Sequence, residues 1–161
     1  MASGKQNGVR IVVSIVIQMI CIWTLTSIFH SIYPNEDVWP ISCITYCVIY
    51  LVLRYTFGYH HFIGISKYKK KRYADAVNDF IKSYIFFAKY KWIDKYRLIF
   101  LMSASSISYR EMALLNAASC FGQLGDIQNS TLYYERALVE FPNSELAMLA
   151  LNFINAAKGN A

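Results

Sequence analysis

Catalytic motifs, cysteine pairs and charge are all scarce in this sequence. The four cysteines, Cys21, Cys43, Cys47 and Cys120, form no C-x-x-C pair and no cysteine–histidine spacing, so zinc sites and disulfide frameworks are not expected. The chain also lacks a glycine-rich phosphate loop, an H-E-x-x-H motif and any nucleophile set in a recognisable motif. We therefore expect a protein that is not an enzyme and holds no metal or cofactor.

Charge is low and unevenly distributed. Only 16% of the 161 residues are charged, whereas 56% are hydrophobic, and both values depart from those of soluble domains. A chain of this length can form one soluble domain, or a small domain together with membrane-spanning segments. The longest apolar runs lie in the first third of the chain, which favours the second arrangement.

The first apolar run covers about residues 11–30. No side chain from Ile11 to Phe29 is charged, and Gln18 is the only strongly polar residue near the middle. Because about 20 residues cross a bilayer core as a helix, the run is long enough to span a membrane. It is too long for the apolar region of a typical signal peptide and no cleavage site follows it, so we interpret it as a retained span.

A second apolar run covers about residues 38–57. Pro40 lies near its start, where a missing N–H costs little, and Arg54 lies near its end, where it can reach the membrane interface. Only the short polar segment SIYPNEDVWP separates the two runs. We therefore expect an antiparallel transmembrane hairpin over residues 11–57.

Flanking charges predict the orientation of this hairpin. Its loop carries Glu36 and Asp37 but no lysine or arginine. Basic residues lie on both other sides, namely Lys5, Arg10, Arg54, Lys67, Lys69, Lys70, Lys71 and Arg72. By the positive-inside rule both termini, including the flank 1–10, are expected in the cytoplasm, as in an integral protein of a bacterial inner membrane.

Residues 58–158 have the pattern of a helical domain. The capping box at Ser108 and Glu111 predicts a helix from about Tyr109 to Gln123. A Gly-Asp pair at 125–126 predicts a turn and a second helix to about Phe141, and a last helix should cover 144–158. No strand-like alternation is present, so the fold class is all-α.

Small and aromatic residues are regularly spaced around the turn at Gly125-Asp126. Leu114, Ala117-Ala118 and Phe121 fit the pattern W-x2-L-G-x2-Y, and Ser130 and Tyr134 fit A-x3-F. Residues 111–144 therefore resemble one tetratricopeptide repeat of 34 residues. A second copy at about 57–90 has Ile63-Gly64 and Ala76-x3-Phe80 in the same positions, with Lys67 in the aromatic position. The resemblance implies a short α-solenoid with an insertion at 91–110, expected to cover the core, and a capping helix at 144–158.

Domains of this family hold peptides or partner proteins on a groove lined by their first helices. Carried over to this chain, the groove positions are His61, Ile65, Tyr68, Met112, Leu115, Ser119 and Gln123. Packing between helices is the alternative role for each of them. No lysine or arginine accompanies Asn116 within 112–123, so a clamp for a C-terminal carboxylate is not supported.

Two pairs of polar residues invite a chemical interpretation. His60 and His61 are adjacent, so their side chains diverge on a helix, and no carboxylate is close in sequence; a packing or interface pair is favoured over a metal site. Asp75 and Asp79 are one turn apart beside a basic run, where a solvated helix face is favoured over a paired-carboxylate site.

The run KYKKKR, with Lys67, Lys69, Lys70, Lys71 and Arg72, should enforce the membrane topology. We also expect these residues to contact anionic lipid headgroups, and we expect no nucleic acid at a patch so close to the membrane.

The sequence thus favours a membrane-tethered protein-interaction scaffold. The alternative is an accessory subunit of a larger membrane complex that packs through its hairpin, using polar and small residues in the spans: Ser14, Gln18, Thr24, Thr26, Ser42 and Thr45.

Overall fold

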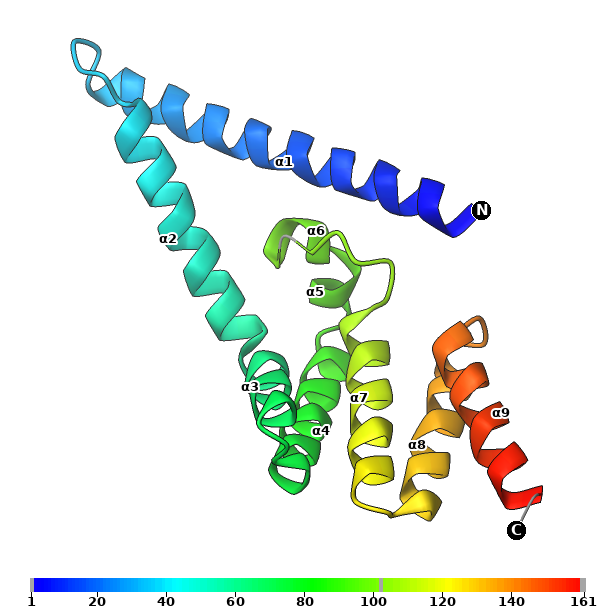
Figure 1. Ribbon diagram of the computed structural model, residues 1–161. Helices are drawn as coiled ribbons and strands as arrows, with labels where there is room; N and C mark the ends of the chain where they lie inside the picture. Colours follow the sequence, from blue (N-terminus) through cyan, green and yellow to red (C-terminus); the bar gives the residue numbers. More distant parts are fainter. Residues whose placement is uncertain (1, 102, 160–161) are drawn as a thin grey trace. The chain divides into compact units, whose positions relative to one another are not determined.

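The computed structural model describes residues 2–101 and 103–159, and within these residues the protein is entirely helical. The described part contains nine helices and no strand (Figure 1). In chain order they are α1 (Ala2–Ile32), α2 (Trp39–Phe57), α3 (Tyr59–Lys69), α4 (Tyr73–Lys89), α5 (Lys91–Lys95), α6 (Arg97–Phe100), α7 (Tyr109–Gln123), α8 (Ile127–Glu140) and α9 (Glu145–Gly159). The predicted all-α class is confirmed.

The chain divides into two compact units. The first, called here the hairpin unit, comprises residues 1–58 and 95–106. The second, the helix-stack unit, comprises residues 59–94 and 107–161. The chain therefore leaves the helix stack after Asp94 and re-enters it at Ile107.

Two helices of the hairpin unit are long and apolar enough to cross a membrane. The candidate spans are Gly8–Ile32 in α1 and Trp39–Phe57 in α2, and in each only 6% of the apolar window is buried. A core helix of a soluble protein would have most of this surface covered. Helix α1 begins at Ala2, so residues 2–10 of the predicted N-terminal flank continue into the same helix as the candidate span.

Polar side chains in the two candidate spans find acceptors in their own helix or at its N-cap. The Ser42 hydroxyl donates to the Val38 carbonyl at 2.7 Å, and the Thr26 hydroxyl donates to the Ile22 carbonyl at 2.9 Å. The Gln18 amide donates to Ser14 Oγ at 3.1 Å. Such bonds satisfy groups that would otherwise be costly in a hydrocarbon environment.

The segment 95–106 packs within the hairpin unit. The Phe100 ring lies edge-on to the Phe57 ring of α2, with 6.4 Å between their centroids, and Leu101 is buried. The Arg97 guanidinium donates to the carbonyls of Ser105 and Ser106 and closes the loop that follows α6. The insertion 91–110 was expected to cover the core of the helical domain. Ile93 and Asp94 near its beginning and Tyr109 near its end are buried in the helix-stack unit, whereas residues 95–106 belong to the hairpin unit.

Asp94 connects the point where the chain leaves the helix-stack unit to the start of α7, where it has returned. One oxygen of its buried carboxylate accepts from the Tyr109 amide at 2.8 Å, and the other accepts from the Arg110 amide at 3.3 Å. Both amides belong to the first turn of α7, where helix N–H groups lack intrahelical partners and the helix dipole favours a negative charge. Asp94 and the N-cap residue Ser108 therefore both accept hydrogen bonds from amides in the first turn of α7.

The helix-stack unit follows its predicted boundaries closely. Ser108 Oγ accepts from the Glu111 amide at 3.1 Å and starts α7, and Asp126 accepts from the Asn129 amide at 3.0 Å and starts α8. The predicted helices over 109–123, to about 141, and over 144–158 correspond to α7, α8 and α9.

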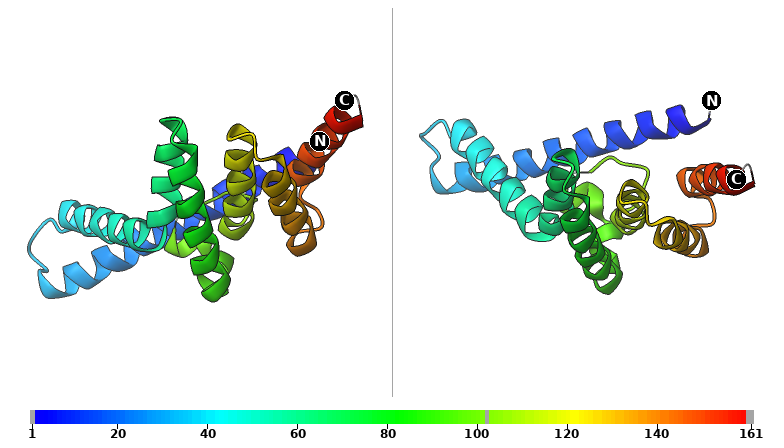
Figure 2. Two further views of the ribbon diagram at one scale, coloured as in Figure 1. Left: turned by 90° about the horizontal axis from the view of Figure 1, so that it is seen from below. Right: turned by 60° about the horizontal axis from the view of Figure 1, so that its bottom comes forward.

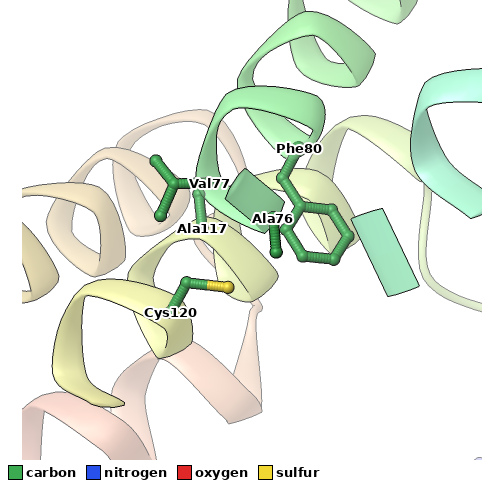
Figure 3. Packing of buried hydrophobic residues seen from close by; sticks show 5 residues of the cluster. All are labelled: Ala76, Val77, Phe80, Ala117 and Cys120. Atoms are coloured by element: carbon green, nitrogen blue, oxygen red, sulfur yellow. The ribbon is translucent and has the colours of Figure 1, made fainter. Parts of the chain in front are cut away.

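Each helix of the stack packs against the next one in the order α3, α4, α7, α8, α9, as Figure 2 shows from two further directions. The central contact joins α4 to α7, where Ala76, Val77 and Phe80 of α4 meet Ala117 and Cys120 of α7 (Figure 3). The two α7 side chains in this cluster, Ala117 and Cys120, are small, so the two helices can approach each other closely. Phe80 of α4 is the large side chain of the cluster. These five side chains form one core cluster of the stack, and Leu114, Leu115, Ala137 and Ala147 form another.

Helices α3 and α7 end in the same hydrogen-bonded motif. After α3, the Arg72 amide bonds to the Lys67 carbonyl and the Lys71 amide bonds to the Tyr68 carbonyl; after α7, Asp126 and Gly125 bond in the same way to Phe121 and Gly122. The motif requires a positive φ at its turning residue. Gly125 supplies it at φ 77° without strain, whereas Lys71 adopts φ 58°.

Candidate protein-interaction site

The predicted groove positions on α3 and α7 divide by burial. His61 and Leu115 are buried, at 2% and 8% exposure, and so cannot be reached by a partner. Ile65, Tyr68, Met112 and Ser119 are half-buried, and Gln123 is exposed. The Tyr68 hydroxyl lies 3.1 Å from Ser119 Oγ, so the structure brings these two positions of α3 and α7 together. The groove stays a prediction, reduced to its five accessible positions.

His61 is a core residue. Its ring packs edge-on against Tyr109 and Phe80, with centroid distances of 4.9 and 5.8 Å, and its Nδ1 lies 3.4 Å from Ser83 Oγ. Burial lowers the pKa of His61 to about 4, because the charged imidazolium cannot be solvated there. His61 is therefore neutral at physiological pH, and the packing alternative describes its environment.

Asp79 is buried, contrary to the expected solvated face. It is 6% exposed and accepts a hydrogen bond from the Lys67 ammonium, while His60 Nδ1 lies 3.4 Å from its other oxygen. The expectation failed because the carboxylate follows its partners by 12 and 19 positions, on a different helix. Asp75 is half-exposed and pairs with Arg72, as a surface residue would.

The basic run is only partly available for lipid contact. Lys67 is engaged with Asp79, and Arg72 with Asp75. Lys69, Lys70 and Lys71 are exposed around the end of α3. Contact between these residues and lipid headgroups stays a prediction.

An apolar cavity lies between α8 and α9. Its volume is about 390 Å³, and it is lined by Ile127 of α8 and by Phe153, Ile154, Ala157 and Lys158 of α9. Phe153 is 75% exposed and Ile127 is 42% exposed. A concave, almost wholly apolar surface with one cation is a suitable binding site for an apolar side chain of a partner.

The exposed face of α9 extends this surface. Leu146, Leu149 and Phe153 follow one another at helical spacing, and each is more than half exposed. A helix that caps a solenoid is expected to be polar on its outer face. Residues 144–158 were expected to form such a cap, but the helical spacing of these three apolar residues, which is present in the sequence, makes the outer face of α9 apolar.

The surrounding half of the helix stack is acidic. Residues 111–161 contain five acidic and two basic residues, whereas residues 58–110 contain three acidic and eleven basic ones. Glu140 also holds a polar contact between α4 and α8, because the Tyr84 hydroxyl donates to it and Arg136 donates to Tyr84 at 2.9 Å. Burial and the bonded Glu140 raise the pKa of Tyr84.

Among the described residues, no three His, Cys, Asp or Glu side chains come together as metal ligands. Burial raises the pKa of the Cys120 thiol to about 11, so this core cysteine stays protonated and is a poor nucleophile.

Comparison with known proteins identifies no relative: no family model, no curated protein and no solved structure matches the chain.

Proposed function

We propose that this protein is a membrane-tethered interaction module. Two spans hold it in the bilayer, and the helix-stack unit binds a partner protein. The observation that carries the proposal is the apolar surface of α9, with its cavity beside Ile127 and a 75% exposed Phe153. A soluble surface rarely leaves such a patch uncovered unless another molecule binds there.

The occupant that fits best is an amphipathic helix of a partner protein. An apolar stripe on that helix would continue the stack by packing against Leu146, Leu149 and Phe153, as helices are recognised in apolar grooves elsewhere. Basic residues beside the stripe would complement the acidic half of the helix stack. A second copy of this chain fits less well, because two surfaces of the same net charge would repel each other.

We infer that the module lies in a bacterial-type inner membrane with both termini in the cytoplasm. Support comes from the two exposed apolar helices and from the lysines and arginines that flank them, while the loop between them is acidic. The tetratricopeptide-like arrangement belongs to the same proposal. It is supported by the common terminal motif of α3 and α7 and by the consecutive packing of the stack.

A fusion experiment tests the topology. Alkaline phosphatase is active only outside the cytoplasm, so a fusion after Ala161 should show low activity and a fusion in the loop at Asn35 should show high activity. The reverse pattern would contradict the proposed orientation.

A matched pair of variants tests the interaction surface. We expect Phe153→Asp to abolish recovery of a partner that co-purifies with the full chain from membranes. Val139→Asp is the control, because Val139 is 82% exposed on α8 but does not line the cavity. The partner is then purified, and its affinity for the full chain in nanodiscs is measured.

Two outcomes would overturn this assignment. One is equal affinity of the purified partner for wild type and for Phe153→Asp. The other is a concentration-dependent dimer that Phe153→Asp dissociates, which would make a second copy the occupant.

The alternative, an accessory subunit that docks through its hairpin, has one observation in its favour: both spans are almost wholly uncovered. Trp23 is 68% exposed on α1. Trp23→Ala should release the partner if the hairpin is the docking surface, and should leave it bound if α9 is.

A further inference from the structure

The hairpin unit contains a cavity of about 310 Å³ where the beginning of α1 meets α6. It is lined by Val9, Arg10 and Val13 of α1 and by Lys95, Arg97 and Leu98 of the segment 95–106. Three of these six residues are cations, three are apolar, and none is a carboxylate. This combination differs from the cavity on α9, which is almost wholly apolar.

One carbonyl group holds two guanidinium groups beside this cavity. Arg10 Nη1 donates to the Ser105 oxygen at 3.1 Å, and Arg97 donates to the same oxygen from Nε at 3.2 Å and from Nη2 at 3.0 Å. Lys95 adds a third cation to the lining of the same cavity. An anion with several oxygen acceptors can accept charge-assisted hydrogen bonds from more than one of these three cations at once.

The apolar half of the lining distinguishes a lipid from a free anion. Val9, Val13 and Leu98 offer nothing to inorganic phosphate, but they can contact the glycerol and the first carbons of an acyl chain. Val9 and Val13 also lie at the beginning of the candidate span Gly8–Ile32. In a bilayer that end of the helix lies at the depth of the phosphate groups.

We propose that this cavity binds the headgroup phosphate of an anionic phospholipid. Arg10, Lys95 and Arg97 contact the phosphate oxygens, and Val9, Val13 and Leu98 contact the adjoining apolar part. The inference rests on the proposed membrane location but not on the protein-binding surface. It concerns residues outside the basic run 67–72, so it adds a defined site to the general attraction of that run for anionic membranes.

Lipid retention by the full chain tests this site. The protein is purified in micelles that contain equal amounts of phosphatidylglycerol and phosphatidylcholine, and the retained lipids are counted by native mass spectrometry. We expect Lys95→Gln to lower the ratio of anionic to zwitterionic lipid about fivefold, and Arg10→Gln with Lys95→Gln to lower it further. Arg10→Lys, which keeps the charge, should retain most of the preference.

Lys82→Gln is the matched control, since Lys82 is an exposed cation of α4 and its loss changes the net charge equally. An equal fall in Lys82→Gln, or an unchanged ratio in the double variant, would overturn the site. Displacement of the lipid by millimolar inorganic phosphate would assign it to a free anion instead.

Circular dichroism checks that each variant is folded, and Lys95→Gln removes no hydrogen bond described above. Extraction of membranes with alkaline carbonate separates this inference from the proposed function. Loss of the wild-type protein from the membrane would contradict the tethering, whereas a retained protein with no lipid preference would contradict the lipid site alone.

Discussion

The helix pairs α3–α4 and α7–α8 make contacts at equivalent positions with different kinds of side chain. Each residue of the first pair is equivalent to the residue 54 positions later in the second pair. The residues of positive φ that end α3 and α7, Lys71 and Gly125, are separated by this interval (125 − 71). At this interval the ion pair of Lys67 and Asp79 in the first pair is replaced in the second by the Phe121 and Tyr133 rings, 5.2 Å apart. An ionic and an aromatic contact thus occupy equivalent places.

The same interval relates two other differences. Buried His61 in α3 corresponds to buried Leu115 in α7, and Gly64 corresponds to Ala118. A Cβ atom on Gly64 would lie 2.8 Å from Phe80 Cε1, so α3 can approach α4 only because this residue has no side chain. The first pair therefore depends on three features that the second does without: an ion pair, a neutral histidine and a glycine.

The largest expected effect comes from His61. Because its pKa is about 4 in the folded protein and 6.5 when exposed, the unfolded chain binds a proton first as the pH falls. The free energy of unfolding should therefore decrease by about 3 kcal/mol between pH 6.5 and 4, with no further loss from this group below pH 4. His61→Leu, which copies the second pair, should remove this slope. Unfolding of the full chain in micelles, followed by circular dichroism, measures it; an unchanged slope would contradict the prediction.

The next effect concerns the close approach at Gly64. Gly64→Ala should lower the free energy of unfolding by about 2 kcal/mol, because the buried Phe80 ring has no room to move. Ala118→Gly should cost only about 1 kcal/mol, from helix propensity. Adding Phe80→Leu to Gly64→Ala should recover part of the lost stability. If Gly64→Ala and Ala118→Gly lower the free energy of unfolding equally, the close approach at Gly64 does not distinguish the two helix pairs.

Replacing the ion pair gives a smaller effect. Asp79→Ala should cost about 1 to 2 kcal/mol, less than a fully buried pair, because the Lys67 side chain is 30% exposed. Lys67→Phe combined with Asp79→Tyr copies the aromatic contact and should be close to neutral. Denaturant titrations of both proteins test this, and a double variant less stable than Asp79→Ala would show that the two contacts are not interchangeable.

The smallest effects are expected at the turns. Lys71→Gly should stabilise the protein by about 1 kcal/mol, because it relieves a positive φ that a residue with a Cβ atom adopts at a cost. Gly125→Ala should destabilise it by a similar amount. Melting temperatures that shift in opposite directions would support both statements, whereas a drop for Lys71→Gly would indicate that the lysine side chain has a structural contact.

Local signals explain how much of the fold the sequence could predict. The boundaries of α7 follow from Ser108 and from the Gly-Asp turn, and the two candidate spans follow from long apolar runs. Each of these sequence features determines the structure of residues only a few positions away. The burial of Asp79 was missed because the carboxylate was judged from its own helix, whereas Lys67 and His60 reach it from α3.

The candidate sites were less predictable for the same reason. The cavity beside Phe153 combines residues of two helices, and the cavity at Arg10 combines residues more than 80 positions apart. The segment 95–106 lies between two helices of the stack in the sequence but packs in the other unit, and no local pattern reveals this. The apolar spacing of Leu146, Leu149 and Phe153 was visible and was outweighed by the expectation of a polar cap.

The Asp94 carboxylate has a consequence for protein engineering. By bonding to the amides of Tyr109 and Arg110, it holds the two ends of an intervening loop at a fixed place on the helix stack. The entropic cost of lengthening a loop that is already closed grows only logarithmically with its length. A change of length between Asp94 and Ser108 should therefore leave the first residue of α7, and with it the register of the helix stack, unchanged.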